Sequence, residues 1–156
     1  NLRSERHTIS ALRSIAEDPH YESYLVALTD RFGDHGIVAI VIARLEGESA
    51  FLDTFLMSCR IMGRQLEAWI LNEMKVRLMA RNCQWFLAEY IPNKRNSVVG
   101  SFLNDHGMTS FVWEKLPDKH PLLALRSLTI MSGQHYYTDL DKFNIPHLDV
   151  FENENI

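Results

Sequence analysis

The stretch SCRIMGRQLEAWIL, residues 58–71, decides the fold, because the chain changes there from a strand pattern to a helix pattern. Residues 50–59 form an apolar run of strand length. Beyond the stretch, apolar residues recur at every fourth position: Leu66, Ile70, Met74 and Leu78. This spacing predicts a long helix that begins near Arg64, directly after the single glycine of the joint, Gly63.

The joint between strand and helix has the composition of an anion-binding turn. A helix N-terminus presents unpaired N–H groups and the positive end of its dipole. Gly63 lets the backbone approach a phosphate closely, and Arg60 and Arg64 add positive charge. The alternative is a solvated arginine pair beside a turn glycine, and these residues alone leave both interpretations open.

The segment before the joint predicts one short helix and an antiparallel meander. Thr8 is suited to cap a helix over residues 9–17. Residues 21–29 and 37–44 are rich in β-branched and aromatic side chains, so we expect two strands there. The glycines and aspartates of residues 30–36 predict the hairpin connection between them. The strand before the joint completes a meander of three.

The segment after the long helix continues the alternation of strands and helices. Residues 85–91 and 111–116 are predicted as strands, and residues 96–106 as a helix. Residues 122–131 fit either a strand or a helix, and residues 138–156 are mixed, with a polar end. The order predicts an α/β fold with a mixed sheet, partly parallel, and helices on its faces.

The overall composition narrows the classes of function. A chain of 156 residues with 46% hydrophobic content can form one sizeable core, so residues 1–156 are expected to be a single domain. A net charge of −4 without a basic run argues against nucleic-acid binding. No apolar run approaches the roughly 18 residues of a membrane span. We therefore expect neither nucleic acid nor membrane as a partner.

The two cysteines and the first residue add two expectations. Cys59 and Cys83 are far apart and lack metal-ligand spacing, so no metal site or disulfide framework is indicated. A reducing, cytoplasmic location is the corresponding expectation. The sequence begins with Asn1 rather than Met, which suggests a piece of a longer protein.

The joint resembles the pyrophosphate-binding signature of the GNAT acyltransferase superfamily. That signature has Arg or Gln, two residues, Gly, one residue, and then Gly or Ala, between a central strand and a long helix. The resemblance implies a GNAT-like fold that binds coenzyme A or a phosphopantetheine thioester. The cofactor-binding residues that it implies at the joint are Arg60, Met62, Gly63, Arg64 and Gln65. Gln65 departs from the pattern, because the family has Gly or Ala there.

A second family feature matches in spacing from Asn96 onward, and it implies that Asn96 also belongs to the cofactor site. Leu103 stands where many members have the tyrosine that protonates the leaving thiolate, and Met108 stands where they have phenylalanine. Since Leu103 has no proton to give, any acyl transfer here needs another acid or water.

Three ordered motifs, DRFGDHGIV, FLMSCRIMGRQLE and EYIPNKRN, resemble the C-terminal region of FkbH-like proteins over about residues 1–108. That family pairs a HAD-type phosphotransferase domain, which loads a glyceryl group onto an acyl carrier protein for polyketide-type biosynthesis, with a GNAT-like domain. The resemblance implies that a HAD-type domain precedes this chain and that an acyl carrier protein is a partner. The DxD pair Asp139 and Asp141 is expected to be a helix cap or loop.

Acyl transfer needs a seat for the pantetheine arm and a base for the acceptor. Pantetheine amides pair with an open strand edge, and the backbones of Met57 and Ser58 are placed for that. Glu89, near the end of its strand, is the leading candidate for the catalytic base, with Asp53 as the alternative carboxylate. Cys59 has no neighbouring histidine in the sequence, so we expect a buried, unreactive cysteine.

Two functions remain open on the sequence. The first is an acyltransferase-like domain that binds a pantetheine thioester and transfers the acyl group to a small acceptor molecule. The alternative is a non-catalytic module that docks the arm of a carrier protein. Leu103 and Gln65 favour the alternative, whereas Arg60, Gly63 and Asn96 support a thioester groove in either case.

Overall fold

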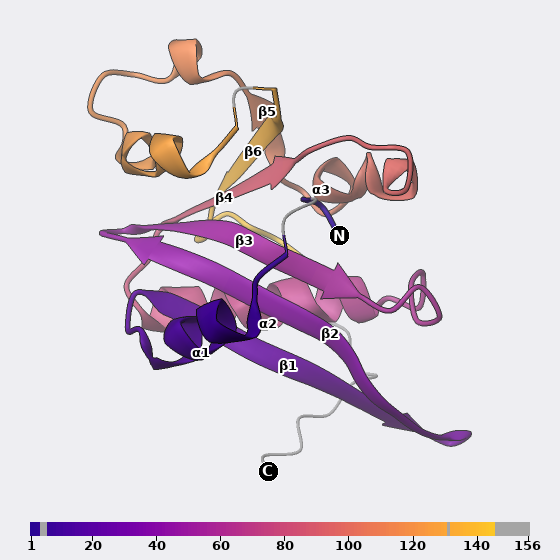
Figure 1. The fold of residues 1–156 in the computed structure, drawn as a ribbon. Coiled ribbons are helices and arrows are strands. Elements are labelled where there is room, and N and C mark those ends of the chain that lie inside the picture. Colours follow the sequence, from indigo (N-terminus) through magenta and orange to yellow (C-terminus); the bar gives the residue numbers. More distant parts are fainter. Residues whose placement is uncertain (4–5, 131, 146–156) are drawn as a thin grey trace.

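A computed structural model describes residues 1–3, 6–130 and 132–145, which form a six-stranded sheet in the order β1-β2-β3-β4-β6-β5 (Figure 1). The strands are β1 (Tyr21–Asp30), β2 (Gly33–Glu46), β3 (Ser49–Met57), β4 (Trp85–Tyr90), β5 (Thr109–Phe111) and β6 (Gln134–Asp139). The α-helices are α1 (Ile9–Glu17), α2 (Leu66–Ala80) and α3 (Phe102–Asp105). Short 3-10 helices are η1 (Ser97–Val99), η2 (Trp113–Lys115) and η3 (Pro121–Leu128). No helix in these described ranges is both long and apolar enough to cross a membrane.

The predicted helix and meander are confirmed. The Thr8 hydroxyl accepts a hydrogen bond from the Ala11 N–H and caps α1. Strands β1, β2 and β3 pair antiparallel in chain order. The prediction of a seven-residue connection over 30–36 is wrong, because Asp30 already pairs with Gly33. The reason is that register shifts in the hairpin let the glycines stay within the strand ladder.

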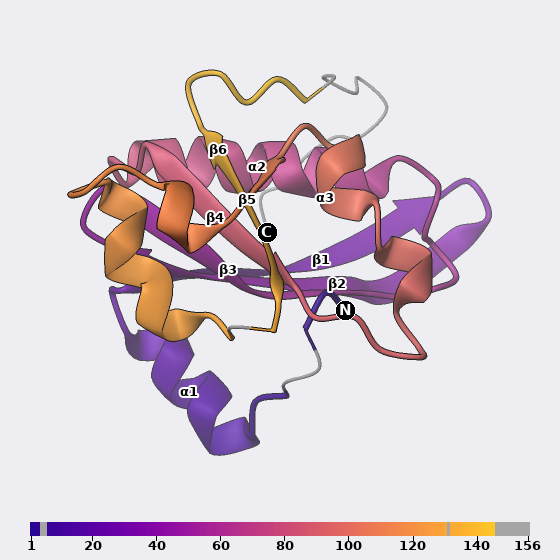
Figure 2. The same ribbon diagram turned by 90° about the horizontal axis from the view of Figure 1, so that it is seen from above.

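The long helix and the parallel crossover are also confirmed. Helix α2 buries the apolar residues that recur along it and connects β3 to β4, which pair parallel. Helices α2 and α3 lie on one face of the sheet, whereas α1 and η3 lie on the other (Figure 2). The fold class predicted from the sequence, a mixed α/β sheet with helices on both faces, is therefore the one observed.

Two predictions after β4 need correction, and one strand was missed, whereas η3 agrees with the helix alternative for residues 122–131. Residues 96–106 form η1 and α3 rather than one helix. Residues 111–116 are not a strand: β5 ends at Phe111, and the chain then turns through η2, which buries Trp113. Residues 122–131 contain most of η3. The last strand, β6, was not predicted: its Tyr and Thr residues favour a strand, but QHYYTD is short and contains no aliphatic residue.

A second, smaller core explains the long excursion between β5 and β6. Helix η3 packs onto the sheet face opposite α2, where five buried residues form one cluster: Phe51, Leu87, Trp113, Leu122 and Leu125. The excursion therefore covers the face of β3 and β4 that α2 leaves open. Asp141 lies in the turn after β6, as expected, and its N–H donates to the Asp139 carboxylate. The expectation of a helix cap or loop is wrong for Asp139, which is the last residue of β6 and pairs with Trp85. The polar end predicted for residues 146–156 lies outside the described residues.

Candidate functional site

A β-bulge at Asp53 changes the direction of β3 in the middle of the sheet. Thr54 pairs with Ile42 of β2 and Leu52 pairs with Ala43, so Asp53 is an extra residue without a partner in β2. A bulge bends its strand and increases the local twist. The bend therefore falls at one defined residue, which is also one of the two candidate carboxylates.

Beyond the bulge, β3 and β4 separate. Their parallel pairing runs from Ser49–Trp85 to Leu52–Ala88 and extends no further among the described residues. Strand β4 stays with β6 up to the pair Tyr90–Gln134. We call this opening the splay. It lies between residues 53–57 of β3 and residues 89–91 at the end of β4. An open strand edge of this kind is the predicted seat of a pantetheine arm.

Residues 1–3 of the same chain occupy the splay. The Ile91 N–H donates to the Leu2 carbonyl oxygen at 3.0 Å, which extends the hydrogen bonding beyond the end of β4. The Leu2 side chain is 4% exposed and belongs to the main hydrophobic core. Arg3, which follows it, is 5% exposed. The segment thus lies inside the opening rather than over it.

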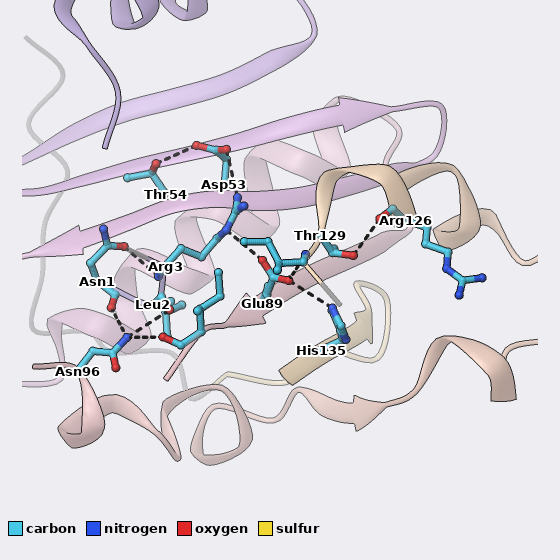
Figure 3. A network of polar contacts seen from close by, with 12 residues as sticks. Asn1, Leu2, Arg3, Asp53, Thr54, Glu89, Asn96, Arg126, Thr129 and His135 are labelled. Atoms are coloured by element: carbon cyan, nitrogen blue, oxygen red, sulfur yellow. Dashed lines mark hydrogen bonds and ion pairs between the residues drawn. The ribbon is translucent and has the colours of Figure 1, made fainter. Parts of the chain in front are cut away.

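Arg3 connects the two strands by its charge (Figure 3). Its guanidinium lies 3.1 Å from the Glu89 carboxylate on β4 and 3.5 Å from the Asp53 carboxylate on β3. The same group lies over the ring of Phe51, at 4.9 Å from the ring centre. Two carboxylates and an aromatic face form a strong binding site for a cation.

Glu89 is buried at the point where the sequence placed the base. It is 1% exposed, and its Oε1 accepts a hydrogen bond of 2.6 Å from the Ile130 N–H. The His135 Nε2 lies 3.3 Å from the same oxygen, because Glu89 and His135 are register partners. A Cβ added at Gly133 would come within 2.5 Å of that oxygen, so a side chain there would displace the carboxylate.

Asp53 is the more accessible of the two carboxylates. Its side chain is 19% exposed and lies 2.5 Å from the His7 Nε2. The Thr54 hydroxyl donates to the same oxygen at 2.9 Å. Together with Arg3 and Glu89, these residues form one polar network across the splay.

The joint has the expected open backbone, but an internal anion occupies it. Gly63 and Gln65 both have positive φ angles, of 78° and 68°. The Gly63 N–H donates to the carboxylate of Glu67 at 2.5 Å, and Glu67 is 8% exposed in the first turn of α2. A carboxylate is favourable at this helix end. A diphosphate bound here would have to compete with Glu67.

The other residues predicted at the joint lie on its surface. Arg60, Arg64 and Gln65 are exposed, so the Gln65 side chain does not fill the opening. Arg64 lies near the β1–β2 hairpin. There the pKa of Asp30 is lowered, mainly by the Phe32 N–H and by His35 and less by the charge of Arg64. The Ser58 N–H donates to the Val38 carbonyl oxygen of β2, so it is directed away from the splay.

A small apolar cavity of about 20 Å³ remains between β3 and η1–α3. It is lined by Asn1, Leu2, Phe55, Met57, Met62, Glu67, Val99 and Phe102. This volume holds about one water molecule, whereas ligand pockets are typically about 300–1,000 Å³. Met57 and Met62 are therefore in the predicted donor groove, which is closed.

A larger cleft of about 610 Å³ opens beside the paired strands β5 and β6. Gly133 and His135, which both approach Glu89, are part of its wall. Its remaining lining residues are Asn104, Ser110, Phe111, Val112, Trp113, Glu114, Lys115, Gln134 and Tyr136. Glu89 is not among the lining residues, and its side chain, which is 0% exposed, lies behind Gly133 and His135.

Asn96 holds the backbone together instead of facing a ligand space. Its side-chain NH2 group donates to the carbonyl oxygens of Asn1, Leu2 and Ile91, and its Oδ1 accepts from the Asn93 N–H. Leu103 is 1% exposed in the main core, so nothing at this position can protonate a thiolate. Cys59 is exposed.

Arg3, His7 and His135 belong to the site but were not predicted from the sequence. Arg3 and His7 lie 50 and 46 residues from Asp53 along the chain. No local pattern connects positions that far apart. The only signal in the sequence was the presence of single arginine and histidine residues, which is too common to be specific.

Comparisons with known proteins define the fold but not the family. No family model and no curated protein matches the sequence. Among solved structures, Tetrahymena GCN5 matches with a TM-score of 0.61 and 11% identity over 88% of this chain and 79% of its own. A GNAT-family acetyltransferase from Staphylococcus aureus Mu50 matches with a TM-score of 0.62 and 14% identity over 84% and 75%. The PaiA N-acetyltransferase from Thermoplasma acidophilum, solved with coenzyme A, matches with 0.55 and 11% over 83% and 66%.

These similarities show that the chain has the GNAT acetyltransferase fold, at low sequence identity. The structures that it resembles are those of enzymes. None of the comparisons supports the resemblance to FkbH-like proteins.

Proposed function

We propose that this chain binds the pantetheine arm of an acyl thioester in the splay and transfers the acyl group to a small acceptor. The observation that carries this proposal is the bulge at Asp53. It separates β3 from β4 and brings two carboxylates to the opened end. The similarity to a fold whose PaiA member was solved with coenzyme A supports the choice of donor.

The donor would lie along the β3 edge, between Met57 and the joint. Its diphosphate would meet the Gly63 backbone at the N-terminus of α2, with Arg60 and Arg64 adding charge from the surface. Because Glu67 accepts the Gly63 N–H in the structure, its carboxylate has to turn away first. The thioester end would then point toward Glu89.

The acceptor would approach from the cleft beside β5 and β6. We assign the base to Glu89, which lies next to Gly133 and His135 in the cleft wall, with Asp53 as the second carboxylate. The base takes a proton from the acceptor amine as its nitrogen attacks the acyl carbon. The C–S bond breaks, and water or another acid protonates the thiolate, because Leu103 has no proton.

A non-catalytic docking module, such as one for an acyl carrier protein, is the second candidate. The buried position of Leu103 and the ion pairs of Glu89 favour it, because both remove groups that catalysis needs. Such a module would bind the same arm without turnover. An FkbH-like setting, with a HAD-type domain before this chain, belongs to this second proposal.

Calorimetry with acetyl-coenzyme A and with a phosphopantetheinylated carrier protein tests donor binding, and release of free thiol with a panel of amines tests turnover. Arg60→Ala should weaken coenzyme A binding about tenfold, as expected for a lost phosphate contact. Arg13→Ala, an exposed arginine on α1, is the matched control and should leave binding unchanged. Carrier binding without thiol release would exclude the enzyme, and equal affinities of the two variants would remove the joint from the donor site.

A further inference from the structure

The splay holds one extended segment, and that segment is residues 1–3. We propose that these residues form a latch, which keeps the site closed and inactive and which has to leave before the thioester arm can bind. This inference rests on the proposed function, since it describes how the same site is regulated. It concerns only described residues and their contacts.

The latch leaves too little space for a donor arm. Leu2 is buried against the apolar groups along which a donor arm would lie, and it is part of the wall of the 20 Å³ cavity. The rings of Phe55 and Phe102 lie with their centres 5.1 Å apart and close the cavity on the other side. A pantetheine arm cannot enter a space of that size. Removing Leu2 from the cavity wall is the smallest change that enlarges it.

The latch is hydrogen-bonded through its backbone to the strand that borders the splay. Leu2 uses its carbonyl oxygen to accept the Ile91 N–H, at the end of the strand that borders the splay. Asn96 donates to the carbonyl oxygens of Asn1 and Leu2 as well. The latch is thus held as an added strand would be, through its backbone. Because the donor is proposed to lie along the β3 edge, release of the latch leaves the Ile91 N–H exposed to solvent.

The latch also places a positive charge between the two candidate carboxylates. Arg3 lies between Glu89 and Asp53 and pairs with both. The Arg3 Nε lies 3.1 Å from the Glu89 Oε2. The Ile130 N–H and the His135 Nε2 already face Oε1, so neither oxygen is open to the proton of an acceptor while Arg3 is in place. The donor seat is filled at the same time. One segment therefore controls both requirements of the reaction.

Coenzyme A is the probe for the test, with the full 156-residue chain. If the latch competes with the donor, the measured dissociation constant is raised by the small fraction of open molecules. Leu2→Ala and Arg3→Gln should therefore each bind coenzyme A about tenfold more tightly than the unmodified chain. Arg13→Ala should bind as the unmodified chain does.

A second readout does not depend on the variants. Amide exchange followed by NMR should show the Ile91 N–H protected without ligand and exchanging faster when coenzyme A saturates the unmodified chain. If Leu2→Ala or Arg3→Gln fails to fold, this measurement decides alone. Coenzyme A binding with Ile91 still protected would overturn the latch and leave the proposed function in place. No binding by the unmodified chain or by any folded variant would overturn both.

Discussion

The two halves of the β3–β4 strand pair differ in chemistry within one residue. From Ser49 to Leu52 the strands are hydrogen-bonded and apolar, and Phe51, Leu52 and Phe86 are at most 2% exposed. From Asp53 onward the strands separate, and charged groups replace the apolar ladder. The closed half has the pattern of a structural core, whereas the open half has the pattern of a site.

The difference shows how one bulge can create a site inside a stable sheet. The closed half is stabilised by burial of apolar area, and this contribution is non-directional, so it does not depend on one specific partner group. The open half holds buried charges, which are stable only while each retains its partner. Loss of a single side chain should therefore lower the free energy of unfolding by different amounts in the two halves.

The largest effect is expected in the closed half. Phe86→Ala removes a fully buried ring from the main core and should lower the free energy of unfolding by about 3–5 kcal/mol. Urea unfolding followed by circular dichroism measures this. Val76→Ala, on the exposed face of α2, is the control and should change stability by less than about 0.5 kcal/mol. A loss for Phe86→Ala as small as the control's would mean that the closed half is not the structural core.

Glu89→Ala should cost somewhat less, about 3 kcal/mol, because it leaves Arg3 buried with Asp53 as its remaining carboxylate. The double variant Glu89→Leu with Arg3→Met replaces the pair by apolar groups and should recover part of that loss. The same unfolding measurements apply. If the double variant were as unstable as the sum of the two single changes, the ion pair would not be the cause.

Gly133→Ala should lower stability by about 2 kcal/mol, because the new Cβ would lie 2.5 Å from the Glu89 Oε1 and push the carboxylate from the Ile130 N–H. The control is the same substitution in the Glu89→Ala background, where the obstructing carboxylate is absent and the change should be nearly neutral. An equal cost in both backgrounds would assign it to the local backbone instead.

Local patterns predicted the elements around the site well. The apolar spacing after Gly63 predicted α2, and Thr8 predicted the cap of α1, because each signal lies within a few neighbouring residues. Glu89 was expected at the end of its strand and lies there. The predicted fold class followed from the order of these elements.

The features that sequence reasoning missed depend on distant partners. The bulge at Asp53 leaves no mark in FLDTFLM, because the same alternation fits a regular strand. Arg3 and His135 reach the site through tertiary packing. Asn96 matched a ligand motif, but its side chain donates to backbone carbonyl oxygens, and the sequence does not distinguish these two roles of an asparagine. Strand β6 pairs with β4 on one side and β5 on the other, and neither pairing can be read from its own six residues.

The smallest effect is expected far from the splay, at the partly exposed pair of Asp30 and His35, where the His35 Nε2 lies 3.0 Å from the Asp30 carboxylate. The Phe32 N–H, the His35 ring and the charge of Arg64 lower the pKa of Asp30 below its ordinary value of 3.8. Because the folded pKa is the lower one, the stabilisation is present above pH 3.8 and is lost as the pH falls through the folded pKa. Asp30→Asn should therefore lower stability slightly near neutral pH and leave it unchanged in strong acid. Asp118→Asn, at an exposed aspartate, is the control for the loss of one surface carboxylate and should leave stability near neutral pH unchanged. An NMR titration that placed the Asp30 pKa at or above 3.8 would contradict this, and it would separate a solvent-screened pair from the buried pairs that hold the splay closed.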